Sequence, residues 1–594
     1  MPKHFLPKEE SHLVSHCLKG VICENDDLSL LENEKVVYYN KYSDSKVSLI
    51  SGGGSGHEPL WSSMVGKGML TAAAQGDVFA SPNDKNIQAA EKATHSNAGV
   101  IFIITNYTGD NLYFGMAAQD LISRYGEDKV RLLRVTDDVA VGKSTGGLVG
   151  RRTLAGHALV MKVLGAASER NYNINDIFQL GVDINKNIAS INAGLDHVHI
   201  PGHGADEDYG QLGPSQIEIG LGIHNEPGVV KINHVPTNEE LINQLLHYIF
   251  NTEDPERGWF EYDKDDEIVL LFNNLGGLPI IEEKALLYQT VKQLDSTYGI
   301  IPARAYSGAF VTSLNAPIFT ITLFNVTKSV STKFSSKQIF DLLDDTTTAT
   351  GWTKSHIPQN DSFKNRIISN FEGYAEDEKA DFSHDINIDS NLLVKVIQTA
   401  ADNVIKKEPE ITDWDTKMGD GDCGKTLETG SLAILRELKQ NSLSDGSVIT
   451  ALHLVLKVIK EDMGGTLGAI LFIFMKSFIN KLEILIADEN SKSENVFGIA
   501  LLHGITTLCE FTKARIGHRT VMDVLIPFCE SFAKSNDINT AVEVARKAAE
   551  GTRKLKPKLG RATYVGGIDN QTDFPPDPGA YGVYEIIDAL KLLA

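Results

Sequence analysis

The spacing of apolar residues changes partway along this chain of 594 residues. Through about residue 325, short apolar runs alternate with glycine-rich turns and helical segments, which is typical of an α/β architecture. Beyond about residue 390, apolar residues recur at spacings of three and four, as on one face of a helix. Because domains usually have about 100 to 200 residues, we expect several domains, with an α/β first half and a helical second half.

Buried strands are expected at the apolar runs of the first half, namely Val47–Ile50, Val100–Ile104, Arg131–Val135, Ile268–Phe272 and Pro317–Leu323. Two of these runs end alike, in Asn106-Tyr107-Thr108-Gly109 and in Asn274-Leu275-Gly276-Gly277, which suggests two subdomains of similar build. Residues 333–389 are rich in Ser, Thr, Asp, Lys and Asn and predict a connector with short helices at most. The expected domains are therefore 1–332 and 390–594.

Amphipathic helices are expected in the second half at Leu392–Ile405, Ile449–Lys460, Thr466–Ile486, Val496–Lys513, Val521–Ala533, Ile538–Leu555 and Tyr581–Leu593. The most apolar stretch, Leu467–Met475, is too short to span a bilayer as a helix, so we expect it to be buried. This pattern predicts a helical bundle or barrel whose polar loops gather at the helix ends.

The charge balance limits the class of partner. The chain has 56 basic and 78 acidic side chains, and a formal net charge of −22 opposes general affinity for nucleic acid or anionic membranes. Five cysteines without a CxxC pair indicate a reducing compartment, and the first residues lack the apolar core of a secretory signal. We expect a cytoplasmic protein with no nucleic-acid or membrane partner.

The first candidate site follows the strand at Val47–Ile50, where Ser51-Gly52-Gly53-Gly54-Ser55-Gly56-His57-Glu58-Pro59 is rich in glycine. Such a loop brings backbone amides close to a small ligand. It is not a P-loop, because no Lys-Ser/Thr closes it, and it lacks the GxGxxG spacing. A Gly-Lys-Ser triplet at 142–144 is discounted, because the earlier glycine of a P-loop would fall on Asp137. A tight strand-to-helix turn without a ligand is the alternative.

Two further clusters favour a ligand. Asp110 follows the strand at Val100–Ile104, at the end where open α/β sheets bind ligands, although it is also a candidate helix cap. His224 lies among glycines in Glu218–Gly228. Together with His57, these residues predict a site that binds a small carbonyl compound and activates one of its hydroxyls. A zinc site formed by the same three residues ranks second, because no helical HxxxH spacing fixes two of them.

An acidic segment marks the second half, where Asp413-Trp414-Asp415-Thr416-Lys417-Met418-Gly419-Asp420-Gly421-Asp422-Cys423-Gly424 follows an amphipathic helix. Its four carboxylates are hard oxygen ligands suited to magnesium or calcium. The calcium-binding EF-hand pattern fails, because the twelfth position from Asp420 is Ser431. A solvated acidic loop remains the alternative.

Magnesium held by few carboxylates usually binds nucleotide phosphates as well. Four glycine-containing loops at helix ends are candidate phosphate ligands: Gly464-Gly465-Thr466-Leu467-Gly468, Gly517-His518-Arg519-Thr520, Gly560-Arg561 and Asp577-Pro578-Gly579-Ala580. Helix N-termini attract anions. These loops predict a nucleotide site at one end of the helical domain.

The sequence resembles the single-chain, ATP-dependent dihydroxyacetone kinases over nearly its whole length. The resemblance rests on residues 52–59, 106–110, 150–152, 220–224, 419–424 and 577–580, which include the glycine, histidine and aspartate clusters described above. It implies a substrate-binding K domain, of α/β type and made of two subdomains, followed by an all-α L domain that is an eight-helix barrel and binds ATP. It also implies a homodimer.

The resemblance assigns roles in the K domain. His224 would add a ring nitrogen to the substrate carbonyl, His57 would hydrogen-bond the substrate, and Asp110 would take the proton from the attacking hydroxyl. The implied substrate contacts are Gly53, Gly54, Ser55, Gly56, His57, Thr105, Asp110 and His224.

In the L domain, the resemblance implies that Asp415, Asp420 and Asp422 bind two Mg2+ ions. The implied nucleotide contacts are Asp422, Cys423, Gly424, Gly465, Thr466, Leu467, Arg519, Thr520, Arg561, Asp577, Pro578 and Gly579. Thr105 stands where the family usually has lysine, and Leu467 where it commonly has serine.

The expected reaction is phosphorylation of dihydroxyacetone, and of D-glyceraldehyde, by ATP. Two alternatives stay open. One is an additional lyase activity that cleaves FAD to a cyclic flavin phosphate, and the other is a non-catalytic regulator that binds dihydroxyacetone. The complete aspartate triad argues against the regulator, because a sensor would need no magnesium site.

Overall fold

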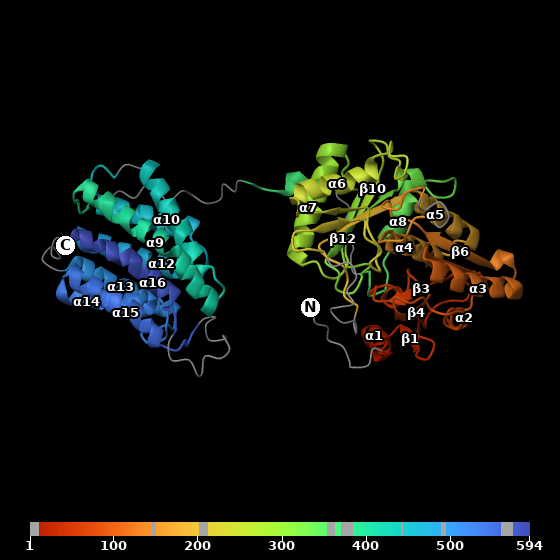
Figure 1. Cartoon of the computed structure of the whole chain (residues 1–594), viewed down its shortest axis with the longest axis horizontal. Coiled ribbons are helices and arrows are strands. Elements are labelled where there is room, and N and C mark those ends of the chain that lie inside the picture. The colour runs from red at the N-terminus through yellow and green to blue at the C-terminus, as the bar shows by residue number, and fades with distance from the viewer. Residues whose placement is uncertain are drawn as a thin grey trace. The chain divides into compact units, whose positions relative to one another are not determined.

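The computed structural model describes residues 11–144, 150–200, 212–352, 363–369, 384–440, 443–488, 495–559 and 574–594. The chain forms two compact units that divide between Asn370 and Phe371 (Figure 1). Within the described residues, no helix is both long enough and apolar enough to cross a bilayer.

The first unit contains two six-stranded sheets, and the first has the order β1-β2-β4-β3-β5-β6. These strands are β1 (Leu28–Leu31), β2 (Val36–Tyr39), β3 (Ser48–Ser55), β4 (Ala72–Val78), β5 (Val100–Thr105) and β6 (Val130–Val135). Strands β4, β3, β5 and β6 are parallel, with Ser48 beside Val100, whereas β1 and β2 form an antiparallel edge. The carboxyl ends of β3 and β5 therefore lie at the same edge of the sheet.

The second sheet has the order β11-β10-β12-β7-β8-β9 and is antiparallel except between β10 and β11. Its strands are β7 (Ile188–Gly194), β8 (Ile217–Ile219), β9 (Val230–Ile232), β10 (Ile268–Asn274), β11 (Arg304–Gly308) and β12 (Ile318–Asn325). All five expected strands are present, and the prediction of two subdomains is confirmed by the two sheets.

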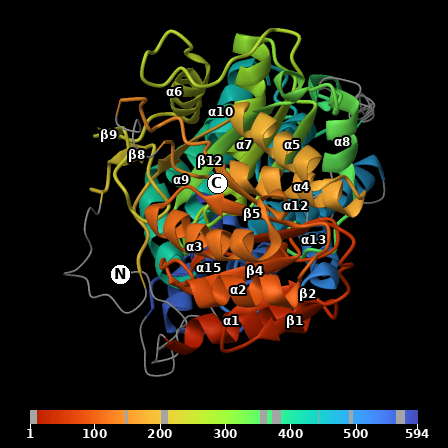
Figure 2. The ribbon, with the colours of Figure 1, turned by 90° about the vertical axis from the view of Figure 1, so that its right-hand side faces the viewer.

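Helices pack between and outside the two sheets. One core cluster contains side chains of both sheets together with α1 (Ser11–Glu24), α4 (Gly156–Glu169), α5 (Ile174–Lys186) and α8 (Ser336–Asp344). Helix α4 is buried from Gly156 to Ser168, as expected of a helix with apolar residues on all sides. Helices α2 (Asp84–Ala93) and α3 (Thr108–Tyr125) cover the outer face of the first sheet (Figure 2). Helices α6 (Asn238–Phe250) and α7 (Ile280–Tyr298) cover the second.

The start of the expected connector belongs to the first unit. Helix α8 lies within residues 333–389, and Phe334, Ile339, Leu343 and Trp352 are buried in the core cluster shared by the two sheets. The placement of residues 334–352 in a connector is therefore wrong. Seven apolar side chains of residues 334–352 belong to this cluster, and they anchor a segment of mostly polar composition.

The second unit is helical. The described residues form α9 (Ser390–Met418), α10 (Cys423–Gln440), α11 (Val448–Asp462), α12 (Gly465–Ala487), α13 (Val496–Phe511), α14 (Met522–Ser535), α15 (Ile538–Gly551) and α16 (Pro578–Asp588). The seven expected helices are confirmed. Sequence reasoning missed α10, whose buried face consists mostly of small residues such as Gly430, Ser431 and Ala433 beside Leu427. The barrel arrangement stays a prediction.

Candidate active site

His57 and His224 come together from the two sheets of the first unit. His57 follows the carboxyl end of β3, and His224 lies in the loop between β8 and β9, yet their Nε2 atoms are 3.0 Å apart. The ring planes are nearly perpendicular, with centroids 4.8 Å apart. The predicted meeting of the two histidines is therefore observed, at the junction of the two subdomains.

The protein environment keeps His57 neutral. Its ring is fully buried, Nδ1 lies 2.8 Å from the carbonyl oxygen of Thr312, and Phe79 stacks on it at 5.0 Å. Burial and then the charge of His224 lower the pKa of His57 to about 3, against the opposing effect of the Thr312 hydrogen bond. Because a carbonyl can only accept, Nδ1 carries the proton and Nε2 presents its lone pair.

Glu226 was given no role by the sequence, although it lies two residues after His224. Its Oε1 is 3.0 Å from Nδ1 of His224, and its Oε2 accepts the backbone N–H of His224 at 2.8 Å. Burial alone would raise the pKa of Glu226, but the hydrogen bonds and charge of His224 lower it to about 2. Glu226 is therefore ionised and orients the His224 ring, which also meets the edge of Tyr107 at 4.8 Å.

Asp110 lies in the first turn of α3, and only 5% of it is exposed. Helix α3 begins after Tyr107, so the alternative role of Asp110 as a cap is wrong. Its Oδ2 accepts a hydrogen bond from the hydroxyl of Thr105, whereas Oδ1 has no partner among the described residues. Burial raises the pKa of Asp110, although hydrogen bonds from Ser81 and Thr105 and the charge of His224 oppose this. A raised pKa suits a carboxylate that accepts a proton.

The glycines before His57 extend a strand and do not form the expected loop, because β3 continues through Ser55. A Cβ on Gly52 would lie 2.1 Å from the carbonyl oxygen of Ala74 on β4, and one on Gly53 would lie 2.3 Å from the Trp61 ring. Close packing therefore requires these glycines. The hydroxyl of Ser55 also serves the fold, since it donates to the carbonyl of Gly76 at 2.7 Å. Gly56 has φ of +103°, which favours glycine.

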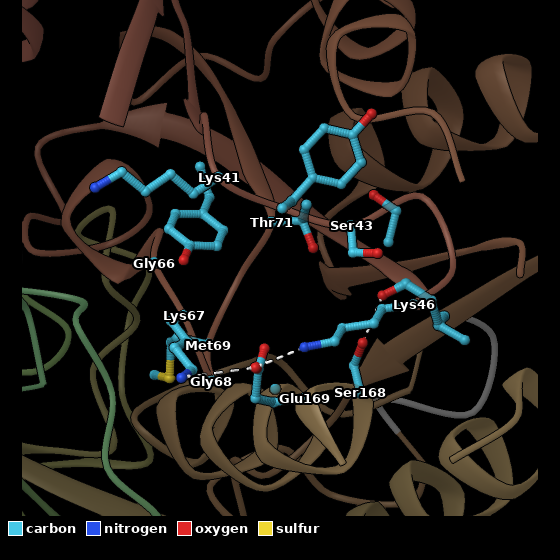
Figure 3. Close-up of a pocket in the computed structure, with 15 residues that line it drawn as sticks. Lys41, Ser43, Lys46, Gly66, Lys67, Gly68, Met69, Thr71, Ser168 and Glu169 are labelled. Atoms are coloured by element: carbon cyan, nitrogen blue, oxygen red, sulfur yellow. Dashed lines mark hydrogen bonds and ion pairs between the residues drawn. The ribbon is translucent and has the colours of Figure 1, made fainter. Parts of the chain in front are cut away.

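A polar cavity of about 250 Å³ lies elsewhere in the first unit (Figure 3). It is lined by residues at the start of β3 and the end of α4, including Ser48 and Ser168, whereas His57 follows the other end of β3. Lys46 and Lys67 reach Glu169, with N···O distances of 2.6 and 4.0 Å. None of the predicted substrate contacts lines this cavity.

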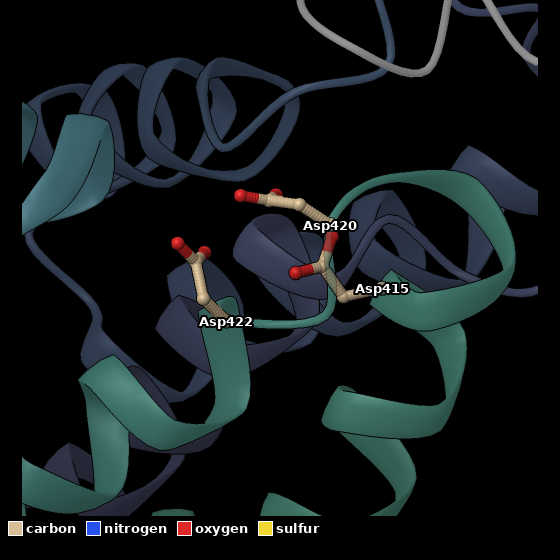
Figure 4. A group of neighbouring side chains, drawn as sticks. All are labelled: Asp415, Asp420 and Asp422. Atoms are coloured by element: carbon tan, nitrogen blue, oxygen red, sulfur yellow. The ribbon is translucent and has the colours of Figure 1, made fainter. Parts of the chain in front are cut away.

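Three carboxylates converge in the second unit (Figure 4). Asp415 lies near the end of α9, Asp420 in the following turn and Asp422 just before α10, and one oxygen of each lies within 4.8 Å of the others. Asp415 also accepts the backbone N–H of Cys423 at 3.0 Å. These hard oxygen ligands fit Mg2+.

The zinc alternative is not supported by the geometry. Within the described ranges, the aspartates of Figure 4 are the only three His, Cys, Asp or Glu side chains placed to share an ion. His57, Asp110 and His224 do not form such a group.

Three of the predicted nucleotide loops lie within the described residues, and Asp577 of one of them is near enough to Asp415 for the two charges to interact. A Cβ on Gly579 would lie 4.0 Å from Leu467 and 3.9 Å from Val521, so the loops before α12, α14 and α16 are neighbours. A Cβ on Gly464 or Gly465 would meet no described atom within 4 Å, and no side chain caps α12. The first amide groups of α12 therefore suit an anion. Pro578 is the first residue of α16, where a missing N–H costs nothing.

Arg519 and Asp577 form a buried pair in this region. The Arg519 side chain is fully buried, with Nη1 3.9 Å from Asp577 and Nη2 donating to the carbonyl of Pro575 at 2.8 Å. Its Nε and Nη1 have no hydrogen-bond partner within the described chain. Burial raises the pKa of Asp577 to about 6, with Arg519 opposing and Asp523 and Asp415 adding to the rise.

Asp523, which sequence reasoning missed, fixes the loop that carries Arg519. Its carboxylate accepts the backbone N–H groups of Gly517 at 2.5 Å and of Thr520 at 2.7 Å. The predicted contact Arg561 lies outside the described residues.

Comparisons with known proteins agree with this division. The Dak1 domain model matches residues 19–349, and the DAK2 domain model matches residues 417–592. A dihydroxyacetone kinase of Komagataella pastoris is 39% identical, over 99% of this chain and 98% of its own length. One of Pichia angusta is 38% identical, over 99% and 97%.

A solved structure resembles the whole chain. The dihydroxyacetone kinase of C. freundii, in complex with AMP-PNP and Mg2+, is 26% identical, with a TM-score of 0.65 over 99% of both chains. Both the α/β unit and the helical unit are thus shared with these relatives, and the chain belongs to the dihydroxyacetone kinase family.

Proposed function

We propose that this chain transfers the γ-phosphoryl group of ATP to a hydroxyl of dihydroxyacetone. One observation carries the proposal. In the unit that matches the Dak1 domain, two histidines meet, and the charge of one of them acts on a buried carboxylate. In the unit that matches the DAK2 domain, three carboxylates converge. D-glyceraldehyde, which also has a carbonyl beside a hydroxyl, is proposed as a second substrate.

His224 is the proposed nucleophile toward the substrate carbonyl. Its Nε2 faces His57, while Nδ1 is held by Glu226, so the ring is fixed with one nitrogen directed into the site. Addition of Nε2 to the carbonyl carbon gives a hemiaminal. A polyol of similar size without a carbonyl cannot form this bond, which makes the site selective.

Asp110 is the proposed general base. Its unpartnered Oδ1 is available to a substrate hydroxyl, and burial raises the pKa of its carboxyl toward that of a useful base. Thr105 supports this role, because its hydroxyl occupies Oδ2 and leaves the other oxygen for the substrate. As the hydroxyl attacks the γ-phosphorus, its proton passes to Asp110.

In the second unit, Asp415, Asp420 and Asp422 would hold the magnesium ions, of which we propose two. Magnesium, when bound, supplies charge neutralisation for the nucleotide phosphates. The amide groups at the start of α12 would bind phosphate oxygens, and Arg519, with two nitrogens that lack a hydrogen-bond partner in the described structure, adds a positive charge. Cys423, Gly424, Thr520 and Arg561 stay proposed nucleotide contacts.

We also propose that the chain forms a homodimer and is cytoplasmic. None of its five cysteines is in a disulfide, which fits a reducing compartment. Light scattering of the purified chain tests the dimer, and a mass of one chain would contradict it. The proposed K domain ends near residue 352, and the proposed L domain spans 390–594.

The reaction product tests the proposed function. The chain is incubated with ATP, Mg2+ and dihydroxyacetone, and phosphorus NMR follows the nucleotide and any new phosphate monoester. We expect one monoester for each ADP formed. Binding of ATP and dihydroxyacetone without a monoester would contradict the proposal and favour the non-catalytic regulator.

A further inference from the structure

The hydrogen bonds around His224 fix where its protons lie before substrate binds. Nδ1 of His57 donates to a carbonyl, so Nε2 of this neutral ring can only accept. Nε2 of His224, 3.0 Å away, must therefore donate in that bond. On its other side, Nδ1 of His224 faces Oε1 of Glu226 at 3.0 Å.

Both oxygens of Glu226 lie against His224: Oε1 is 3.0 Å from ring Nδ1, and Oε2 accepts the backbone N–H at 2.8 Å. The hydrogen bonds and charge of His224 lower the pKa of Glu226 to about 2, so its carboxylate is ionised at neutral pH and can only accept. Nδ1 of His224 must then carry a proton as well. Both ring nitrogens of His224 are protonated, and the ring is an imidazolium paired with Glu226.

This protonation state leaves no lone pair on Nε2 for attack, so the proton there has to leave as the carbonyl is trapped. Resting on the proposed function, we propose that Glu226 is a positioning residue that keeps His224 doubly protonated until substrate binds. The proton on Nε2 of His224 is then the one that the carbonyl oxygen receives. After trapping, Glu226 neutralises the positive charge of the adduct.

The trapping step balances without any further reactant. The Nε2–H bond of His224 breaks, and its proton passes through Nε2 of His57 to the carbonyl oxygen. The freed electron pair on Nε2 forms the bond to the carbonyl carbon, while the π pair of the carbonyl forms the new O–H bond. The ring keeps its positive charge and its Nδ1–H, which remains hydrogen-bonded to Glu226. Charge and protons are therefore the same before and after.

Other charged groups near this pair have partners of their own. Burial raises the pKa of Tyr107 well above its usual range, so its phenol stays neutral. Arg152 pairs with Asp138 at 2.8 Å, and Asp110 is hydrogen-bonded by Thr105. Within the described chain, Glu226 thus supplies the carboxylate that contacts the His224 ring.

The backbone around Glu226 holds this geometry. Asn225 has a positive φ of 65°, and its side chain exchanges hydrogen bonds with the backbone of Val198 at 2.8 and 2.9 Å. The carbonyl of Ile223 accepts the hydroxyl of Ser313 at 2.5 Å. The residues on either side of His224 are therefore tied to neighbouring loops.

The test compares native chain, Glu226→Gln and Glu226→Asp. Nitrogen NMR of the full chain labelled at histidine reports directly whether each ring nitrogen of His224 carries a proton, and His224→Ala assigns the signals. We expect both nitrogens protonated at neutral pH in the native chain and in Glu226→Asp, and one unprotonated in Glu226→Gln. A neutral His224 ring in the native chain would overturn the inference without any variant.

Trapping of dihydroxyacetone labelled at its carbonyl carbon gives the second readout, because the carbon signal changes when the hemiaminal forms. With a doubly protonated His224 as the reactive form, the trapping rate falls as pH rises. In Glu226→Gln we expect this fall to begin at lower pH, because the carboxylate that stabilises the imidazolium is gone. An unchanged pH profile in Glu226→Gln, with trapping intact, would overturn the inference and leave the proposed function standing.

Glu218→Gln is the matched control. Glu218 is a buried carboxylate on β8, the strand that precedes the loop of His224 and Glu226. It contacts His197 at 3.0 Å and accepts the backbone N–H of Gly228 at 2.7 Å, and no described contact joins it to His224. We expect its pH profile to match that of the native chain. If the pH profile of trapping shifted in Glu218→Gln as much as in Glu226→Gln, the support of the loop, and not the ion pair with Glu226, would set the protonation of His224. If the native chain traps no dihydroxyacetone, the proposed function fails, while the nitrogen signals still test the protonation of His224.

Discussion

Replacing Asp420 with asparagine has two opposite effects on stability. Without metal it relieves the repulsion among the three aspartates, and with magnesium it removes a proposed ligand of the ion. The aspartate oxygens lie within 4.8 Å of one another, where two unit charges in water repel by about 0.9 kcal/mol. Asp420 takes part in two such pairs, and salt near physiological strength reduces their sum to about 1 kcal/mol. Without metal, the free energy of unfolding of Asp420→Asn should therefore exceed that of the native chain by up to about 1 kcal/mol.

Magnesium should reverse this order. The native chain gains stability from an ion that binds the folded state, whereas Asp420→Asn loses a ligand and most of that gain. The assay is thermal unfolding of the full chain in chelator and across a magnesium titration. Asp413→Asn is the control, because Asp413 is exposed, lies outside the triad and pairs with Lys417 at 2.6 Å. An undiminished magnesium shift in Asp420→Asn would refute the metal site, and a less stable metal-free variant would refute the estimate of repulsion.

Three other predictions concern the first unit. Gly53→Ala places a Cβ 2.3 Å from the buried Trp61 ring, so we expect a loss of about 1 to 3 kcal/mol in denaturant unfolding. Asp110→Asn removes the proposed base, and we expect kcat to fall about 10²- to 10⁴-fold with trapping retained, as measured by ADP formation and the carbon signal. Burial lowers the pKa of His157 from 6.5 to about 3, so its contribution to stability is lost as pH falls from 6.5 toward 3. The loss by pH 4 is about 3 kcal/mol, and His157→Asn should remove it, as unfolding at pH 7 and pH 4 will show.

Each of these predictions has a contradicting outcome. A Gly53→Ala chain as stable as the native one would mean that the Trp61 ring shifts at no cost. Unchanged kcat in Asp110→Asn would assign the proton to another group. Equal acid sensitivity of the native chain and His157→Asn would show that His157 takes up its proton without unfolding the chain.

The apolar spacing predicted most of the fold, because long buried strands and amphipathic helices have strong periods. It failed where few residues decide the packing. Helix α10 buries mostly small residues, and the segment around α8 is anchored by seven apolar side chains that stand between polar residues. Local composition carries neither signal clearly.

The sequence pointed to the candidate residues of the site but not to the residues that orient them. His57 and His224 stood out because glycines surround them, whereas Glu226 acts through a contact that depends on loop conformation. Asp523 likewise acts by accepting two backbone N–H groups. The glycines before His57 predict a ligand loop from the sequence, because a sequence does not show that Ala74 and Trp61 lie against them.

The most direct test of the carbonyl-trapping site is ATP consumption with magnesium, measured with dihydroxyacetone and with glycerol as the control that lacks a carbonyl. Native chain and His224→Ala are compared side by side. We predict rapid ADP formation by the native chain with dihydroxyacetone, none above background with glycerol, and a strong loss in His224→Ala. Equal turnover with glycerol, or full activity in His224→Ala, would contradict the proposed role of His224.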